Sequence, residues 1–348
     1  MNIQGKTIWQ QACGDTDRNY AEVCLKWDVI LNGPGYAGPW PECVKQLQKD
    51  DVSSRKITDL KRFAEGIKDG DIIVLRLGTT DVLGVGIVVG DYLWHDEFSD
   101  IDGWDLQHVR RVKWLWNGLT KPKKFPTYTL KQGDTTQKLD SQKVINWINT
   151  LTIPQTAINR KLHELPDSSE NEIEIDEISE YLFDQGVSSN SIEALIREID
   201  ELIRIAKWYR KFTNPSESET IAYLVIPLLR ALGWTPQKMA IEWNNVDIAL
   251  FSKLPRRDSN LSAVVEVKKK DRSCLSAKSQ AQSYAQGKQS CNRLIVTDGL
   301  RYGIYLRKQN QFHLYAYFNL TALKNEYPIY NCHGIKEALR VMTPEWNE

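Results

Sequence analysis

Two short apolar segments in the last third of the chain carry charged residues that a packed sheet tolerates only with a partner. Residues 246–251 read Val-Asp-Ile-Ala-Leu-Phe, and residues 263–268 read Ala-Val-Val-Glu-Val-Lys. Side chains alternate between the two faces of a strand, so Glu266 and Lys268 share one face and the valines beside them take the other. If the segments pair as a hairpin, Asp247 joins the charged face. Burying two carboxylates is costly unless something compensates their charge.

A bound divalent cation supplies such compensation. Carboxylate oxygens are hard ligands that suit Mg²⁺, and this ion activates water and stabilises negative charge in phosphoryl chemistry. The E-x-K triplet alone is common, and a solvated surface hairpin is the plain structural explanation for it. The full D-x18-E-x-K pattern on two apolar segments favours a cation site more strongly than the triplet does.

The elements around this pattern predict an α/β core. A long amphipathic helix is expected over 192–209, begun by Ser191, and a second from Asn214 to a stop at Gly233. A third helix, 275–288, separates the second and third of five expected strands. These strands are 246–251, 263–268, 293–297, 303–306 and 312–317.

Four ordered motifs within residues 210–320 resemble the PD-(D/E)xK nuclease superfamily, and specifically the nuclease domain of type I restriction subunits. The first is Glu-Ser-Glu-Thr at 217–220, followed by Pro-Leu-Leu-x-x-Leu-Gly-Trp. The second is the charged strand pair, and the third is Gln-x-x-x-Tyr at 280–284. The fourth is Leu-Ile-Val-Thr-Asp-Gly-Leu-Arg-Tyr-Gly-Ile-Tyr at 294–305. The resemblance implies a restriction-endonuclease-like α/β core that hydrolyses DNA phosphodiester bonds with Mg²⁺, or with Mn²⁺ in its place.

The same resemblance assigns roles to individual residues. Asp247 and Glu266 would hold the metal, with the carbonyl of Val267 as a further ligand. Lys268 would orient or deprotonate the attacking water and stabilise developing charge. Glu217 would contact a water on the metal or a second metal ion.

Three further residues complete the expected site. Gln280 and Tyr284, one turn apart on a helix, would contact the DNA backbone or brace the site, and ordinary helix packing is the alternative. Glu219 competes with Glu217 for the role in the first helix, although the spacing to Thr220 favours Glu217. Type I subunits carry a motor after the nuclease, but this chain has no G-x-x-x-x-G-K-[ST] loop, so no ATP site is expected.

Residues 1–117 predict a mainly β domain rich in tryptophan. Strands are expected over 71–77, 82–89 and 110–116, after a short helix at 57–67. The segment holds seven tryptophans, and an aromatic core accounts for some of them, such as Trp114 or Trp116 on the last strand. An aromatic cage for a flat base or a methylated group accounts for others.

The order of these elements resembles the EVE/YTH-type PUA-like fold. The resemblance implies a barrel-like domain that reads a modified base, often one flipped out of the duplex. Trp27, Trp40 and Trp94 are the expected cage, with Asp28 as the hydrogen-bond partner of the base edge.

Charge and composition divide the chain into three expected parts. Residues 1–117 carry a net charge of −4 and residues 118–206, an expected connector and helical linker, carry −5, with a boundary in the acidic stretch 166–186. Residues 207–348, the expected nuclease domain, carry +9, which favours an anionic partner such as nucleic acid.

The remaining composition excludes several classes. Six cysteines without a C-x-x-C pair argue against a zinc ribbon or a disulfide framework. The five histidines show no metal-ligand spacing. No apolar run approaches the roughly 18 residues of a membrane span, and the start lacks the apolar core of a signal peptide. We therefore expect a soluble, cytoplasmic protein with no membrane partner.

The leading interpretation is a modification-dependent restriction endonuclease that serves in defence against phage with modified DNA. Its partner would be modified duplex DNA, and it would act as a homodimer to cut both strands. Two alternatives stay open. The chain is a non-catalytic nucleic-acid-binding protein with a retired nuclease fold, or it is a nuclease whose N-terminal domain senses a small ligand or a protein.

Overall fold

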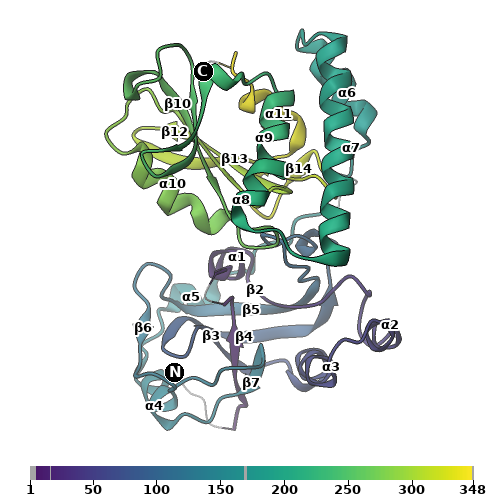
Figure 1. Cartoon of the computed structure of the whole chain (residues 1–348). Helices are drawn as coiled ribbons and strands as arrows, with labels where there is room; N and C mark the ends of the chain where they lie inside the picture. The colour runs from purple at the N-terminus through teal and green to yellow at the C-terminus, as the bar shows by residue number, and fades with distance from the viewer. Residues whose placement is uncertain (1–4, 16, 168–170, 347–348) are drawn as a thin grey trace. The chain divides into compact units, whose positions relative to one another are not determined.

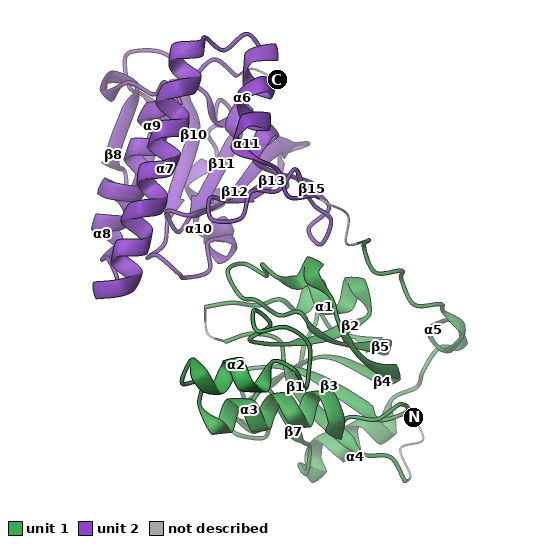
Figure 2. Cartoon of the chain, turned by 90° about the vertical axis from the view of Figure 1, so that its right-hand side faces the viewer, with its two compact units in different colours: residues 1–168 green, residues 169–348 purple. Residues whose placement is uncertain are grey.

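The chain folds into two compact units, residues 1–168 and 169–348 (Figures 1 and 2). The computed structural model describes residues 5–15, 17–167 and 171–346. Each unit is built around one sheet, so the protein belongs to the mixed α/β class.

The sheet of unit 1 is curled, and β-bulges on its longest strand contribute to the curl. β1 and β3 are parallel, and the other paired strands are antiparallel. The strand order is β2 (Val29–Asn32), β5 (His108–Asn117), β4 (Asp81–Trp94), β3 (Ile72–Leu77), β1 (Ile8–Ala12) and β7 (Thr136–Lys138), with β6 (Lys123–Lys124) added to β4. A mainly β N-terminal domain was expected and is compatible with this sheet.

Short helices flank the unit 1 sheet. They are α1 (Ala21–Trp27), α2 (Val44–Lys49), α3 (Ser54–Lys61) with a π-helical turn Arg62–Gly66, the 3-10 turn Asp96–Phe98, α4 (Gln142–Thr150) and α5 (Gln155–Asn159).

Trp114 is a core residue, as predicted. It is 5% exposed, and its indole nitrogen donates to the carbonyl of Cys24 at 2.9 Å. Glycines on β4 make room for it, since a Cβ at Gly86 would lie 2.9 Å from Trp114 Cε3 and 2.5 Å from a methyl of Val112. The glycines on β4 thus leave the space that the Trp114 indole fills.

The sheet of unit 2 has eight strands. β10 and β11 are parallel, as are β13 and β15, and the remaining neighbours are antiparallel. The order is β14 (Glu326–Tyr327), β15 (Cys332–His333), β13 (Gln311–Asn319), β12 (Arg301–Lys308), β11 (Arg293–Thr297), β10 (Leu261–Val267), β9 (Val246–Phe251) and β8 (Met239–Trp243).

Helices cover both faces of this sheet (Figure 1). α10 (Lys278–Ala285) packs on one face through Ala281 and Ala285. The other face carries α6 (Ile175–Asp184), α7 (Ser189–Phe212), α8 (Glu217–Thr220), the π-helical turn Ile221–Val225, α9 (Ile226–Ala231) and α11 (Ile335–Met342). Short 3-10 turns lie at Pro236–Lys238, Asp258–Asn260 and Leu275–Ala277.

The unit boundary differs from the expected three-part division. Residues 118–206 form no connector, because their first part completes unit 1 and their second part belongs to unit 2. In unit 1, β7 pairs with β1, and α4 buries Val144 and Ile148 against the sheet. In unit 2, the apolar stripe of α7 joins the main core. The boundary itself falls inside the acidic stretch 166–186, as expected.

Helix starts and stops follow local chemistry. α7 begins three residues earlier than expected, with Ser188 rather than Ser191 as the N-cap, and Ser188 Oγ accepts from the Ser191 N–H at 3.3 Å. The expected helix from 214 to 232 is interrupted by the π-helical turn before Pro227, which has no N–H to continue an α-helical ladder. Gly233, with a φ of +99°, ends it as predicted.

The partly buried carboxylate of Glu337 joins three elements of unit 2 through hydrogen bonds. Glu337 on α11 accepts hydrogen bonds from Tyr181 of α6 at 2.5 Å, from Tyr315 of β13 at 2.6 Å and from Arg340 at 2.8 Å. Partial burial opposes its ionisation, but the three donors more than offset that and lower the pKa of Glu337 to about 2.

We predict that Glu337→Gln lowers the free energy of unfolding by about 1–3 kcal/mol at neutral pH, because a carboxylate with charged and phenolic donors is lost. A carboxyl whose pKa is depressed stabilises the fold above its unfolded pKa, near 4.5, and loses this effect as the pH falls towards 2. Urea titrations of both proteins from pH 7 down to pH 2.5 measure the difference. Glu201→Gln, in an exposed pair with Arg204, is the control and should change stability by less than about 0.5 kcal/mol. A constant gap between Glu337→Gln and the parent across this range would contradict the assignment.

Candidate active site

The structure brings Asp247, Glu266 and Lys268 together at one end of β9 and β10. Backbone pairing between these strands ends at Val265 and Ile248, and beyond that point the Asp247 carboxylate accepts a hydrogen bond from the Val267 N–H at 2.7 Å. Lys268 Nζ donates to Glu266 Oε1 at 3.1 Å. The expected convergence of the three side chains is therefore present.

The expected alternation of faces is present as well. Val265 and Val267 belong to the core under α7, α9 and α11, whereas Val264 belongs to the core under α10. Glu266 shares the parity of Val264 and so points to the α10 face of the sheet. The hairpin register, extended by one residue, places Asp247 opposite Glu266 on that face.

Glu266 is a buried carboxylate that is only half compensated. Its side chain is 1% exposed, and its Oε2 atom has no hydrogen-bond partner in the structure. Burial raises the pKa of Glu266 to about 7, with the charge of Asp247 adding to the effect, and Lys268 offsets only part of it. Burial also raises the pKa of Asp247. The site therefore holds more negative charge than its single ammonium balances.

α10 presents the two remaining motif residues to the same place. Gln280 Oε1 accepts from Lys268 Nζ at 2.9 Å, and Gln280 Nε2 donates to the Tyr284 hydroxyl at 3.2 Å. The hydrogen-bonded order is thus Glu266, Lys268, Gln280, Tyr284. Gln280 is thus bonded to the Lys268 ammonium, and the choice between bracing the site and contacting DNA stays a prediction.

Glu217 and Glu219 both lie in the first turn of α8, but only Glu219 takes part in the helix cap. Glu219 is used in a capping box, since its carboxylate accepts from the Ser216 N–H at 2.7 Å and its own N–H donates to Ser216 Oγ at 3.1 Å. Glu217 takes no part in that cap, and its charge contributes to the raised pKa of Glu266. Glu217 is thus the acid of the pair that the helix cap does not use, and its role at the site stays a prediction.

Thr220 sets the position of α8. It is fully buried, and the close approach of α8 to the β11–β12 turn leaves no room there for a side chain. A Cβ at Gly299 would lie 2.7 Å from Leu224 Cβ and 3.0 Å from Thr220 Cγ2, and Gly299 has a φ of +89°. Only glycine suits this turn, and its close contact fixes the helix that carries Glu217.

Glu242 is a residue that the sequence analysis missed. It lies in β8 between the pairs Ile241–Ile248 and Trp243–Val246, which places it opposite Asp247 in the hairpin. Its φ is +54°, a left-handed conformation that is uncommon for glutamate, and its charge contributes to the raised pKa of Asp247. An exposed acid in a short amphipathic strand gives no signal of this kind in the sequence.

The donor set suits a hard divalent cation. Two carboxylates with raised pKa values, one orphan carboxylate oxygen and the adjacent Val267 carbonyl provide oxygen ligands of the kind that Mg²⁺ takes. The N–H and C=O of one strand residue project to the same side, so the Val267 carbonyl faces Asp247 as its N–H does. No group of three or more His, Cys, Asp or Glu side chains in 5–15, 17–167 and 171–346 is arranged as a metal cluster. The set expected here needs only two such side chains and a backbone oxygen.

In unit 1, the structure places two of the three expected cage tryptophans around one loop. Trp94 Nε1 donates to the Gly35 carbonyl at 3.4 Å, and the Trp40 N–H donates to the Tyr92 hydroxyl at 3.0 Å. The same hydroxyl bonds His108 Nδ1 at 2.7 Å, and burial lowers the pKa of His108 to about 4. The buried imidazole and the Tyr92 hydroxyl thus hold the backbone of Trp40. The Trp40 indole itself donates to Glu65 Oε1 at 2.8 Å and packs on Cys43, Leu47 and Leu60, whereas Trp94 is 36% exposed.

Trp27 and Asp28 lie elsewhere. Trp27 ends α1, just before β2 begins, whereas Trp94 pairs with His108 across from Asn32, where β2 ends. The carboxylate of Asp28 accepts two hydrogen bonds from Arg160, at 2.5 and 2.7 Å, and two from His163, at 2.8 and 3.0 Å. Trp27 lies at the other end of β2 from Trp94, and the carboxylate of Asp28 is used in an ion pair with Arg160. The four expected residues therefore do not form one cage.

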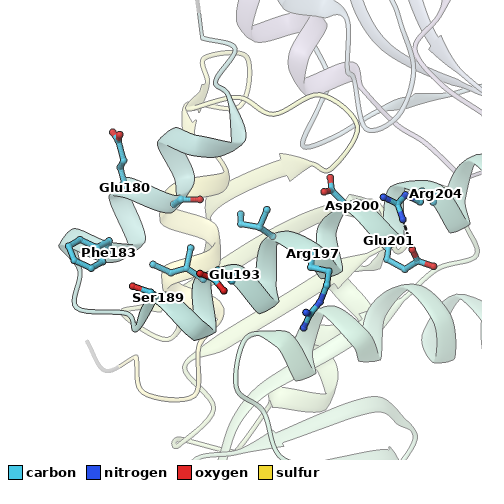
Figure 3. A pocket seen from close by; sticks show the side chains of 11 residues that line it. Glu180, Phe183, Ser189, Glu193, Arg197, Asp200, Glu201 and Arg204 are labelled. Carbon is cyan, nitrogen blue, oxygen red and sulfur yellow. Dashed lines mark hydrogen bonds and ion pairs between the residues drawn. The ribbon is translucent and has the colours of Figure 1, made fainter.

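A separate groove of about 610 Å³ lies between α6 and α7 (Figure 3). Figure 3 shows Phe183 and Ser189 at one end of it and the Glu201–Arg204 pair at the other. It is lined by side chains of these two helices and contains none of the site carboxylates. The groove is therefore a feature of unit 2 that is separate from the carboxylate cluster.

One family model matches the chain, described as a domain of unknown function (DUF8426), over residues 9–139. The match begins in β1 and ends just after β7, so it spans every strand of the unit 1 sheet. The matched residues thus lie within unit 1 and make up well under half of the chain. The chain matches no curated protein. None of the helices in the described part of the chain is long and apolar enough to cross a membrane.

The Asp28 ion pair yields a stability prediction. Burial opposes ionisation of Asp28, yet the donors from Arg160 and His163 lower its pKa below the ordinary value. We predict that Asp28→Asn lowers the free energy of unfolding by about 1–3 kcal/mol and speeds hydrogen exchange in residues 155–167, which the pair holds to the sheet. Asparagine keeps the left-handed φ of 56° at this position, so the charge is the only large change.

The exposed pair of Lys131 with Asp140 provides the control for this measurement. Asp140→Asn should alter neither the exchange of 155–167 nor the stability by more than about 0.5 kcal/mol. Unchanged exchange in Asp28→Asn would show that the segment is held by other contacts.

Proposed function

We propose that this protein is a Mg²⁺-dependent endodeoxyribonuclease, and that its N-terminal unit directs it to DNA with modified bases. The observation that carries the proposal is the half-compensated Glu266 beside Asp247, with Lys268 bonded to both Glu266 and Gln280. Stability alone would favour apolar residues here, because uncompensated carboxylates in a core are costly. A site that binds a cation and a phosphate explains why they are present.

The arrangement of side chains suggests how the reaction would run. Asp247, Glu266 and the Val267 carbonyl would hold Mg²⁺, which would polarise the scissile phosphate and activate water as the nucleophile. Lys268 would orient that water and stabilise the negative charge that develops on the phosphate oxygens. Glu217, from α8, would contribute a further carboxylate at the edge of the site. Gln280 would hold the Lys268 ammonium in position by accepting a second hydrogen bond beside the one to Glu266.

The retired-fold alternative has less support. In a chain under no catalytic constraint, an apolar residue in place of Glu266 would stabilise the fold, since a buried carboxylate that is only half compensated is costly. Glu266 is nevertheless present, and Lys268 beside it is hydrogen-bonded to Gln280, which in turn bonds Tyr284.

We predict that Asp247→Ala, Glu266→Gln and Lys268→Ala each reduce DNA cleavage with Mg²⁺ by at least about 100-fold. The assay compares phage DNA that carries modified bases with unmodified plasmid. Mg²⁺ should raise the melting temperature of the parent but not that of Glu266→Gln, whereas without metal Glu266→Gln should be at least as stable as the parent. Cleavage by Asp247→Ala at the rate of the parent would overturn the site.

A matched pair of variants on α8 sharpens this test. Glu217→Gln should slow cleavage, because it removes a charge near Glu266. Glu219→Gln keeps a side-chain acceptor for the Ser216 N–H and should cut at the rate of the parent. Equal effects of the two substitutions would remove Glu217 from the mechanism.

The proposed reader surface of unit 1 centres on Trp40 and Trp94. Trp94, at the end of β4, donates to the carbonyl of Gly35, and Asp105 Oδ2 accepts from the Gly35 N–H at 3.1 Å, which holds the Gly35 loop in place. Trp40 lies further along the same segment, with its indole bonded to Glu65. Partly exposed indoles held in this way are suited to stack on a base.

We predict that Trp94→Ala or Trp40→Ala weakens binding of modified duplex by about 5- to 150-fold relative to the parent and erases the preference over unmodified duplex. Trp27→Ala is the matched control, because Trp27 lies at the other end of β2. Binding is measured by fluorescence anisotropy in the cleavage-deficient Asp247→Ala background. If modified and unmodified duplexes bind equally to the parent itself, a ligand or protein sensor becomes the better interpretation of unit 1.

A further inference from the structure

The last two turns of α7 expose large aromatic side chains. Trp208 is 53% exposed and Phe212 is 62% exposed, and their rings lie one turn apart with centroids separated by 5.5 Å. Tyr223, in the π-helical turn that follows α8, is 54% exposed. Side chains of this size rarely stay in water unless a partner covers them.

Cations alternate with these rings. Lys207, Arg210 and Lys211 are all exposed, and none of them forms an ion pair with another residue of the described segments. The Lys211 ammonium lies 5.2 Å from the centroid of Phe212. Positive charge at a helix C-terminus complements the helix dipole, which explains the cations but not the exposed rings between them.

We name the aromatic–basic patch as Lys207, Trp208, Arg210, Lys211, Phe212 and Tyr223. It differs sharply from the rest of α7, where the groove towards α6 is lined by Glu180, Glu193, Asp200 and Glu201 with only Arg197 and Arg204 to balance them (Figure 3). Unpaired cations therefore gather at one end of the helix, where the exposed rings also lie.

The patch is connected to the carboxylate site through α8. Tyr209 is buried on the same turns of α7, and the π-helical turn Ile221–Val225, which carries Tyr223, packs against α7. α8, which begins with Glu217, leads directly into that turn, and the hydroxyl of its last residue, Thr220, accepts a hydrogen bond at 3.4 Å from the N–H of Lys270, two residues beyond Lys268. A strand of nucleic acid lying on the patch would thus be led towards the acids.

We propose that the aromatic–basic patch binds an unpaired stretch of nucleic acid beside the cleavage site, with bases stacked on Trp208 and Phe212 and phosphates near the three cations. This inference rests on the proposed nuclease function and narrows its substrate to DNA with a single-stranded segment at or near the cut. Stacking requires bases that are not already stacked in a duplex. Single-stranded nucleic acid offers both free bases for the rings and a negative backbone for the cations, whereas an acidic protein surface would match the cations alone. The probe that fits is therefore a single-stranded oligonucleotide.

The test measures binding of a fluorescent 20-nucleotide poly(dT) strand to the full chain carrying Asp247→Ala, in buffer with EDTA. Trp208→Ala and Phe212→Ala should each weaken binding by about 5- to 150-fold, the range for loss of one stacking contact, while Trp208→Phe should stay within about 3-fold of the parent. The triple change of Lys207, Arg210 and Lys211 to Gln should reduce the salt dependence of binding.

Phe183→Ala is the matched control, since Phe183 is equally exposed, at 63%, but lies on α6 beside acidic residues. It should leave the affinity for poly(dT) unchanged. A 20-base-pair duplex should lose less affinity than poly(dT) when Trp208 is replaced, because its bases are already stacked.

The outcomes separate this inference from the proposed function. If Trp208→Ala binds poly(dT) as tightly as the parent, the patch is not a stacking surface and the inference fails, even if the parent cleaves DNA. If sedimentation shows that Trp208→Ala dissociates a dimer without changing poly(dT) affinity, the patch is a self-association surface instead, and the inference is again overturned. If the parent never cleaves DNA but loses poly(dT) binding on these substitutions, the nuclease proposal fails while the patch stands.

Discussion

The bond from the Val267 N–H to the Asp247 carboxylate occupies the point where β9 and β10 stop pairing. Two strands that separate at the end of a ladder leave backbone groups without partners, and each such group needs one if it is buried. Here a side chain takes the place of the next strand residue. The Asp247 carboxylate thus satisfies the Val267 N–H where the ladder ends, and the adjacent Glu266 has one carboxylate oxygen without a hydrogen bond among the described residues. Helices pack on both faces of the sheet that carries these residues.

Much of the geometry of the candidate site was predictable because it depends on short-range rules. Strand alternation alone places Glu266 and Lys268 on one face and the flanking valines on the other, and α10 brings Gln280 and Tyr284 to that face because residues four apart share a side of a helix. The spacing to Thr220 already favoured Glu217 over Glu219, but only the structure shows, through hydrogen bonds, that Glu219 caps the helix. Glu242 could not be predicted, since its position opposite Asp247 depends on the left-handed backbone of one strand residue.

The domain boundaries were less predictable, for a different physical reason. An amphipathic stripe such as that of α7 shows that a helix has a partner but does not say which one. A segment rich in charge and proline, such as 118–139, looks like a linker when it is in fact held by strand pairing through β7. With the boundary where the structure has it, each unit contains equal numbers of acidic and basic residues. The net positive charge of residues 207–348 is therefore balanced within unit 2 by the acidic residues of α6 and α7 and those just before them. The two units do not differ in net charge.

The contact of Gly299 with Thr220 and Leu224 has a consequence for how mutations would be distributed in natural variants of this fold. α8, the helix that carries Glu217, lies this close to the β11–β12 turn only because Gly299 has no side chain. A single methyl group at that turn would shift the helix without altering one charge, one ligand or one strand of the sheet. Substitutions that inactivate such a protein would then include changes at a small, uncharged residue with no chemical role of its own, and Gly299 should be as intolerant of replacement as the buried Asp298 beside it.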